Sequence, residues 1–234
     1  MKTVGLIGGM SWESTIPYYR TINEMVKAQL DGLHSARIVL YSVDFHEVER
    51  YQYQGDWKAA ALLLARVAKS LQAAGADFVV LCTNTMHKIA ADIEAAVDIP
   101  LLHIADATAE AIVETDIRKV GLLGTRFTME QEFYKDRLSR THNLEVVTPN
   151  EHDRELVHRV IYDELCLGIV DDSSRNEYRR IMAMLSDRGA QGIILGCTEI
   201  ALLVRPEDSP VPLFDTAEIH ARAAANLALS ESRL

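Results

Sequence analysis

Two cysteines stand at matching places in two similar stretches of this sequence. The stretch VVLCTNTMHK begins at residue 79 and contains Cys82, and the stretch IILGCTEIAL begins at residue 193 and contains Cys197. Because a thiol has an unperturbed pKa of about 8.5, a thiol and a thiolate coexist near neutral pH. Cys82 and Cys197 on opposite sides of one carbon atom could therefore act as alternating base and acid, and so invert a stereocentre that bears a proton.

Small hydroxyl and amide side chains follow both cysteines and lead into expected helices. Backbone N–H groups at the start of a helix bind carboxylates. The same donors would stabilise the enediolate-like charge that forms as an α-proton leaves. We expect Glu199 to hold an α-ammonium group. The other candidate donors are Thr83, Asn84, Thr85 and Thr198.

Three blocks of the sequence recur in the same order, at nearly constant offsets of 116, 115 and 112 residues. We infer two similar α/β halves related by a pseudo-twofold axis, each with a cysteine at the carboxyl end of a strand. That edge of an open α/β sheet is where ligands bind. The matched pairs are Gly8 with Gly124, Cys82 with Cys197, and Pro100 with Pro212.

Short runs rich in Val, Ile and Leu alternate with longer amphipathic stretches, which is typical of parallel strands connected by helices. Spacings typical of a capping box predict helix starts at Thr128, Ser174 and Asp215. The loops at residues 8–15 and 124–129 should form further walls of a cleft, with Thr125 in the second. Strands are expected at 3–8, 36–42, 77–82, 119–124, 144–148 and 191–196, with short ones after Pro100 and Pro212.

The predicted fold class is therefore α/β, with two Rossmann-like domains, mostly parallel sheets and an active site in the cleft between them. The first domain would comprise residues 1–103 plus 214–234 and carry Cys82. The second would comprise residues 104–213 and carry Cys197. A terminal helix at about 215–229 is expected to pack back onto the first half.

Composition excludes several function classes. A net charge of −10 without a basic cluster disfavours nucleic acid and membrane partners, and the absence of a long apolar run favours a cytoplasmic protein. Three cysteines without a CxxC pair suggest neither a disulfide framework nor a zinc site, and no cluster has metal-ligand spacing. The GLIGGM loop lacks the third glycine of a dinucleotide-binding motif. We expect no metal and no cofactor. Cys166, His87 and His103 are interpreted as structural residues.

The motifs GLIGGMSWEST, LCTNTMH and GCTEI, in this order and spacing, resemble those of the cofactor-independent aspartate/glutamate racemases over essentially the whole chain. The resemblance implies a substrate between two Rossmann-like domains, proton transfer without pyridoxal phosphate or metal, and often a homodimer. It implies that Cys82 and Cys197 are the catalytic pair. The substrate contacts that it implies are Met10, Thr83, Asn84, Thr85, Thr198 and Glu199.

One departure concerns the side chain of the substrate. Aspartate racemases of this family hold the side-chain carboxylate with an arginine in an IPDR segment and with a lysine, where this chain has DFHE and Cys166. A related subgroup that shares DFHE favours Gln52 for this task, and Arg50 and Arg126 are the other candidates. The expected activity is racemisation of glutamate, aspartate or both.

Two alternatives remain open. A relative on the same scaffold could act on another acid, as a hydantoin racemase, a malonate decarboxylase or a maleate isomerase does; some of these use only one cysteine. A non-catalytic dicarboxylate-binding protein would instead use the cysteines for packing or redox sensing, and its ligand would bind without exchange of the α-proton.

Overall fold

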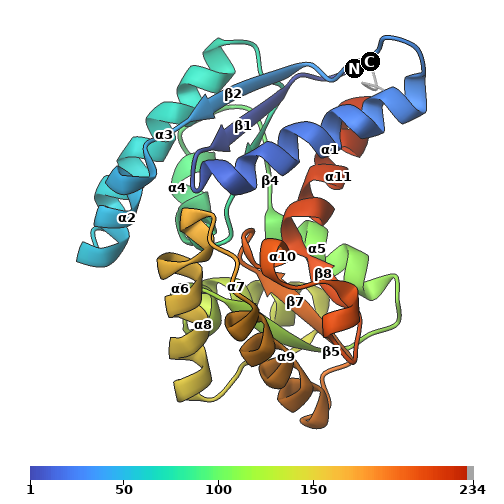
Figure 1. Ribbon diagram of the computed structural model, residues 1–234. Helices are drawn as coiled ribbons and strands as arrows, with labels where there is room; N and C mark the ends of the chain where they lie inside the picture. Colours follow the sequence, from blue (N-terminus) through green and yellow to red (C-terminus); the bar gives the residue numbers. More distant parts are fainter. Residues whose placement is uncertain (231–234) are drawn as a thin grey trace. The chain divides into compact units, whose positions relative to one another are not determined.

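The computed structural model describes residues 1–230, which form two compact units (Figure 1). Unit 1 comprises Met1–Ile104 together with the C-terminal segment that begins at His220, and unit 2 comprises Ala105–Ile219. Each unit contains a four-stranded sheet in which every pairing is parallel. The predicted α/β class with two similar parallel sheets is confirmed.

The sheet of unit 1 has the strand order β2-β1-β3-β4. Its two central strands are fully buried and entirely apolar or glycine, as expected for parallel strands that are covered on both faces. The strands are β1 (Val4–Gly8), β2 (Ile38–Ser42), β3 (Phe78–Leu81) and β4 (Leu101–Leu102). The helices are α1 (Trp12–Leu30), α2 (Phe45–Gln54), α3 (Trp57–Ala73), the 3-10 helix η1 (Thr85–Ile89) and α4 (Ala90–Glu94).

The last described helix returns to unit 1. Helix α11 (Thr216–Leu229) starts in unit 2 and ends in unit 1, where the N–H of Lys2 donates to the carbonyl of Ala228 at 2.8 Å. Asp215 caps this helix, because its Oδ1 accepts the N–H groups of Ala217 and Glu218. The predicted helix start at Asp215 and the return of the last helix to the first half are confirmed.

Unit 2 repeats the topology, with the strand order β6-β5-β7-β8. The strands are β5 (Lys119–Gly124), β6 (Glu145–Val147), β7 (Gly192–Gly196) and β8 (Leu213–Asp215). The helical segments are α5 (Ile104–Val113), α6 (Arg126–Glu130), α7 (Glu132–Asp136), the π-helical η2 (Arg137–Thr141), α8 (Glu151–Asp163), the 3-10 helix η3 (Leu165–Leu167), α9 (Asp172–Asp187), α10 (Ile200–Leu203) and the 3-10 helix η4 (Pro206–Asp208).

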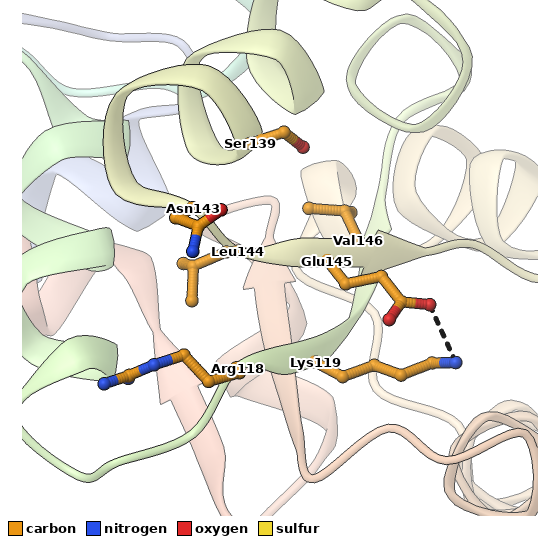
Figure 2. Close-up of a pocket in the computed structure, with 7 residues that line it drawn as sticks. All are labelled: Arg118, Lys119, Ser139, Asn143, Leu144, Glu145 and Val146. Atoms are coloured by element: carbon orange, nitrogen blue, oxygen red, sulfur yellow. Dashed lines mark ion pairs between the residues drawn. The ribbon is translucent and has the colours of Figure 1, made fainter.

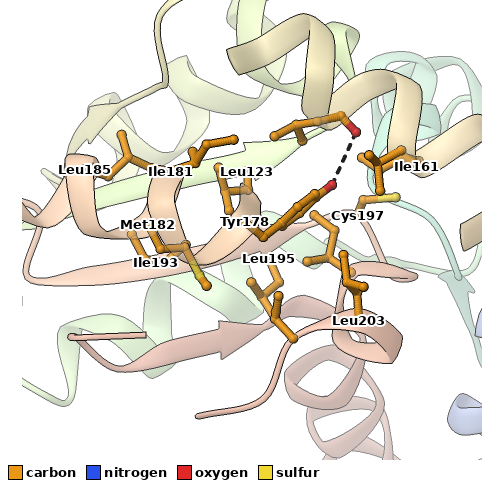
Figure 3. Close-up of a cluster of buried hydrophobic side chains, with 14 of the residues drawn as sticks. Leu123, Ile161, Tyr178, Ile181, Met182, Leu185, Ile193, Leu195, Cys197 and Leu203 are labelled. Atoms are coloured by element: carbon orange, nitrogen blue, oxygen red, sulfur yellow. Dashed lines mark hydrogen bonds between the residues drawn. The ribbon is translucent and has the colours of Figure 1, made fainter. Parts of the chain in front are cut away.

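A buried cluster between the sheet and helices α8 and α9 forms the core of unit 2 (Figure 3). Tyr178 lies fully buried within it, and its hydroxyl donates to the carbonyl of Val157 at 3.2 Å, so the one polar atom of this large side chain is satisfied. Cys197 belongs to the same cluster. The thiol is therefore held by a packed core and not by a loose loop.

The expected strands agree with the observed ones to within two residues at every end. Two expected helix starts were wrong. Thr125 caps α6, since its Oγ1 accepts the N–H of Thr128, and Asp171 caps α9, since it accepts the N–H of Ser173 at 2.7 Å. Both caps have an extended backbone, which the residue before a helix needs, whereas Thr128 and Ser174 lie inside the helices.

The chain passes between the two units at residues that differ from the expected domain boundaries. The chain leaves unit 1 after Ile104, one residue later than expected, and returns at His220, six residues later than expected. The reason for the second difference is β8, which pairs with β7 and keeps Phe214 and Asp215 in the sheet of unit 2. The return therefore occurs within α11.

Candidate functional site

The two cysteines lie at the carboxyl edges of the two sheets. Cys82 directly follows β3, and its N–H donates to the carbonyl of Ile7 at 3.0 Å, which continues the parallel ladder. Cys197 directly follows β7. Cys82 is fully buried, whereas 8% of the surface of Cys197 is exposed. Each unit thus contributes one thiol at the edge where α/β sheets bind ligands.

The hydrogen-bond register of each sheet shows which residues of the two units occupy equivalent positions. The first repeated block equates Ile7 of β1 with Leu123 of β5. In unit 1 the ladder pairs Ile7 with Leu81, and in unit 2 it pairs Leu123 with Leu195. Leu81 and Leu195 therefore occupy the same position in their sheets.

One residue further on, Cys82 corresponds to Gly196, and Thr83 corresponds to Cys197. The offset that matched the two cysteines was therefore wrong by one residue. A shift of one residue at a strand end turns a side chain to the other face. A Cβ at Gly196 would lie only 2.8 Å from the Leu123 carbonyl oxygen, so unit 2 has no space for a side chain at the level of Cys82.

Cys82 is fully buried. Its Sγ donates to the carbonyl oxygen of Val80 over a distance of 3.8 Å. Burial alone raises the pKa of the Cys82 thiol well above its usual range. Burial therefore favours the protonated form of this thiol.

Cys197 has a charged partner. Its Sγ donates to Oε2 of Glu199 at 3.0 Å, and the hydroxyl of Thr198 donates to the same oxygen at 2.9 Å. Burial, and then the negative charge of Glu199, raise the pKa of the Cys197 thiol well above its usual range. Glu199 is thus placed to accept the proton of Cys197. The sequence predicted Glu199 as a ligand of an ammonium group and did not predict this contact with the thiol.

The other residues after β3 form a buried turn. Thr83, Asn84 and Thr85 are all buried, and the N–H of Thr83 donates to the carbonyl of Leu81 at 2.8 Å. His87 closes the turn, because its Nδ1 lies 2.7 Å from the carbonyl oxygen of Thr83. The residues predicted to bind the substrate in unit 1 are therefore held close to Cys82.

The glycine-rich first loop and its counterpart are also at the carboxyl edges. Met10 is buried in the core of unit 1, and Thr15 Oγ1 accepts the N–H of Gly9 at 2.9 Å. In unit 2, Thr125 is buried and caps α6. Arg126 has its own partner, since its guanidinium lies 3.8 Å from the carboxylate of Glu155.

The three candidates for holding the side-chain carboxylate are placed differently. Gln52 is buried in unit 1, and its Nε2 donates to Sδ of Met86 at 3.0 Å, within the helix that follows the Cys82 turn. Arg50 lies over the ring of Tyr51, at 5.3 Å from the ring centre. Gln52 therefore contacts the segment that follows Cys82, whereas Arg50 contacts its own neighbour Tyr51.

Cys166 lies in the short 3-10 helix η3. It is partly exposed and packs against the buried cluster of unit 2 that contains Cys197. A small side chain thus stands beside that cluster at the position where the resemblance led us to expect a lysine.

Two surface pockets lie away from these residues. One, of about 520 Å³, is at the amino ends of β5 and β6, opposite to the edge that carries Cys197 (Figure 2). Lys119 there is paired with Glu145 at 2.8 Å. The other, of about 640 Å³, lies along α3 and α4 and is lined by residues such as Trp57 and Leu62. None of the predicted site residues lines either pocket.

Within residues 1–230, no group of three or more His, Cys, Asp or Glu side chains could hold a metal ion. In the same part of the chain, none of the helices is long and apolar enough to cross a membrane.

Comparison with known proteins shows which family this chain matches. Residues 7–224 match the Asp/Glu/Hydantoin racemase family. A Yersinia pestis protein described as a candidate Asp/Glu racemase has a crystal structure that is 63% identical, with a TM-score of 0.91, over 98% of this chain and 100% of that one. The structure of an aspartate racemase homologue from Pyrococcus horikoshii is 36% identical, with a TM-score of 0.82, over 97% and 99% of the two chains.

A more distant sequence relative is the broad specificity amino-acid racemase RacX of Bacillus subtilis. It is 22% identical over 233 residues, which are 97% of this chain and 98% of RacX. The predicted resemblance to the aspartate/glutamate racemases is confirmed by these matches.

Proposed function

The chain belongs to the Asp/Glu/hydantoin racemase family, and on that premise we propose that it racemises an acidic amino acid, glutamate or aspartate, by moving a proton at Cα. A relative described as a candidate Asp/Glu racemase and another described as an aspartate racemase homologue support the choice of an acidic substrate. The observation that carries the proposal is the hydrogen bond from the Cys197 thiol to the Glu199 carboxylate at the carboxyl edge of a parallel sheet.

Cys197 is the proton-transfer group of unit 2. Transfer of its proton to Oε2 of Glu199, 3.0 Å away, produces a thiolate and a neutral carboxylic acid without a change in the total charge. The thiolate then removes the α-proton and becomes a thiol again, while the electron pair of the C–H bond passes into the substrate carboxylate as an enediolate. N–H groups and hydroxyls after the strand ends stabilise that charge, with Thr83, Asn84, Thr85 and Thr198 as donors.

The end of β3 supplies the second proton-transfer group. Cys82 is the thiol there, and its burial keeps a proton available to return to the carbanion. Cys82 then becomes a thiolate, and after the product leaves it regains a proton from water while Glu199 loses the one it accepted. Thr83 stands at the level of Cys197, but a hydroxyl is a much weaker acid and a poorer base than a thiol. A pair of Cys82 and Cys197 exchanges roles and works in both directions. A pair of Thr83 and Cys197 would remove the proton from one enantiomer only.

Two substitutions separate these pairs. With Cys82 as the acid–base group, Cys82→Ala lowers racemisation by about 1,000-fold, as for the loss of a general acid–base group. Thr83→Val then raises KM but preserves exchange from both enantiomers. If Cys82→Ala keeps the wild-type rate and Thr83→Val loses it, the role passes to Thr83.

The function itself is tested in D2O. Purified protein is incubated with L-glutamate, L-aspartate, a neutral amino acid and a 5-substituted hydantoin, without added cofactor. Deuterium at Cα together with the opposite enantiomer, for an acidic amino acid above all others, is the expected result. Binding of a dicarboxylate without any exchange would instead indicate a binding protein, and exchange of the hydantoin alone would indicate a hydantoin racemase.

We also propose that the protein works as a homodimer and needs neither pyridoxal phosphate nor a metal. Sedimentation gives the mass of the assembly. Activity that survives dialysis against EDTA and treatment with hydroxylamine would support the cofactor-independent reaction, since these reagents remove metals and pyridoxal phosphate.

A further inference from the structure

We propose that His87 is a positioning residue, which holds the Thr83 carbonyl and thereby fixes the direction of the amides and side chains of the turn at residues 82–85. The inference rests on the proposed function, because that turn is where unit 1 would supply its acid–base group and its donors to the substrate. His87 itself would not touch the substrate.

The hydrogen bonds of His87 assign its tautomer. The backbone N–H of Ile104 donates to Nε2 at 3.2 Å. A backbone N–H is always a donor, so Nε2 accepts and carries no hydrogen. The hydrogen is therefore on Nδ1, which donates to the carbonyl oxygen of Thr83 at 2.7 Å. The ring is neutral, and both of its nitrogens are used in one orientation.

A second histidine supports the same region. His220 donates from Nε2 to the carbonyl of Leu102 at 2.9 Å, since a carbonyl only accepts, and its Nδ1 accepts from the hydroxyl of Tyr18 at 3.0 Å. The ring centre of His87 lies 6.0 Å from that of His220 and 4.4 Å from that of His103. All three rings are buried, so His87 cannot rotate to a different partner without disturbing its neighbours.

The contacts of His87 join two segments that are distant in sequence. One is the turn after β3, and the other is Ile104, the residue after which the chain leaves unit 1. Loss of the Nδ1 donor would leave the Thr83 carbonyl buried without this partner and allow the turn to rotate. A displacement of about 1 Å in groups that bind or protonate a substrate can cost roughly 100-fold in rate.

Two substitutions of His87 distinguish positioning from packing. In His87→Asn the amide nitrogen can take the place of Nδ1 and donate to the Thr83 carbonyl. In His87→Gln the amide reaches the place of Nε2 instead, so an acceptor for Ile104 survives but the donor to Thr83 is lost. Glutamine is the closer match to histidine in size. A role in packing alone therefore favours His87→Gln, and a role in positioning favours His87→Asn.

The expected result is that His87→Asn keeps kcat within about fivefold of wild type and that His87→Gln loses about 100-fold, mostly in kcat. Tyr18→Phe is the matched control, since it removes a buried hydrogen bond of the same cluster away from the turn and lowers stability without changing kcat. Equal losses in both His87 variants, or the reverse order, would overturn the proposal.

Amide hydrogen exchange of Thr83, Asn84 and Thr85 provides a second measurement that needs no substrate. We expect faster exchange in His87→Gln and unchanged exchange in His87→Asn. This readout separates the two ideas: a wild-type protein without racemase activity contradicts the proposed function, whereas unchanged exchange in His87→Gln contradicts the positioning role.

Discussion

The two units share one sheet topology but hold the segment after the central strand by different means. In unit 1, the buried His87 ring holds the turn after Cys82 through the Thr83 carbonyl, and the neighbouring His220 ring donates to the Leu102 carbonyl at the end of β4. In unit 2, charges do this work, beginning with Glu199 at the Cys197 thiol. A repeated fold therefore does not repeat its electrostatics, and the two thiols have different surroundings.

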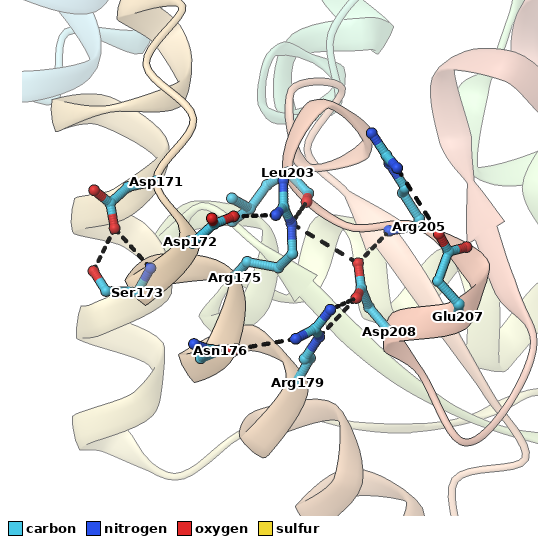
Figure 4. A network of polar contacts seen from close by, with 10 residues as sticks. All are labelled: Asp171, Asp172, Ser173, Arg175, Asn176, Arg179, Leu203, Arg205, Glu207 and Asp208. Atoms are coloured by element: carbon cyan, nitrogen blue, oxygen red, sulfur yellow. Dashed lines mark hydrogen bonds and ion pairs between the residues drawn. The ribbon is translucent and has the colours of Figure 1, made fainter.

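The charged network continues at the end of α10 (Figure 4). Arg175 Nε donates to the carbonyl of Leu203, the last residue of this helix, at 2.7 Å. The side chain of Asp208 is only 2% exposed. It accepts the N–H of Arg205 at 2.8 Å and a guanidinium N–H of Arg179 at 2.6 Å. These contacts fix the short helix that follows Glu199.

The pKa directions reflect the same contrast. Burial lowers the pKa of His220 to about 4, despite the hydrogen bond to the Leu102 carbonyl. Burial by itself would raise the pKa of Asp208, but the Arg205 N–H and the Arg179 guanidinium outweigh it and hold that pKa below its usual range. We therefore expect mild acid to destabilise unit 1 through His220, whereas the contacts of Asp208 with Arg179 and Arg205, called the clamp below, should persist.

The largest expected effect on activity comes from giving the end of β7 the same residue as the end of β3. Cys197→Thr would place in unit 2 the residue that unit 1 carries at the same level. Because a hydroxyl is a poor base, racemisation of glutamate should fall by about 1,000-fold or more. Cys166→Ser is the control, since it changes a thiol in the same unit and should preserve activity. A Cys197→Thr protein within tenfold of wild type would remove Cys197 from the chemistry.

The second prediction concerns the acid sensitivity of unit 1. Since the folded pKa of His220 is about 4 and the unfolded value about 6.5, the unfolded chain binds this proton first as the pH falls. Full stability is therefore present above pH 6.5, and about 3 kcal/mol of the unfolding free energy should be lost between pH 6.5 and pH 4. Both tryptophans, Trp12 and Trp57, lie in unit 1, so their fluorescence during urea unfolding measures that unit.

His220→Gln is the matched variant for this measurement, because glutamine does not titrate. Its stability at neutral pH should be lower, but the loss between pH 6.5 and pH 4 should be smaller than in wild type. The same slope in both proteins would show that other groups cause the acid sensitivity.

The third prediction addresses the clamp of unit 2. Asp208→Asn removes the charge that balances Arg179, whose guanidinium is half exposed, so we expect a loss of about 2 kcal/mol, below the range for a fully buried pair. Hydrogen exchange should accelerate in α9 and α10 and not in β1 or β3. Glu207→Gln is the control, since Glu207 is exposed and 4.0 Å from Arg205, and should change stability by less than about 0.5 kcal/mol. Equal effects of the two variants would contradict the clamp.

The smallest expected effect concerns substrate choice. Gln52→Ala should raise KM for glutamate about tenfold, roughly the value of one hydrogen bond to a charged group, and leave KM for a neutral substrate unchanged. Gln54→Ala, an exposed residue at the end of the same helix, is the control. If KM rises equally for both substrates, Gln52 packs against Met86 and does not recognise the side chain.

Most of the fold could be predicted because its determinants are local. Apolar runs of four to six residues predict the strand ends to within two residues. The spacing of Asp215 and Glu218 predicts the start of the last helix. The errors at Thr128 and Ser174 arose because two caps were possible in each region. Backbone conformation, which the letters do not specify, decided between them.

Part of the site could be predicted as well. The equivalence of Thr83 and Cys197, which was not predicted, also has a signal in the sequence. The runs that begin at residues 79 and 193 match without a gap as far as Leu81 and Leu195, at an offset of 114. Shifting the match by one residue to align the two cysteines broke that pattern. An ungapped alignment places Thr83 opposite Cys197.

The sequence by itself determined the fold class, the strand ends at which both cysteines lie, and the family. These follow from patterns of a few neighbouring residues. The tertiary structure decided which residue of unit 1 occupies the sheet position equivalent to that of Cys197, because only the hydrogen bonds between strands fix the register within each sheet. It also decided that Glu199 accepts from the thiol and that His87 holds the Thr83 carbonyl, since both contacts depend on how a turn folds back on itself.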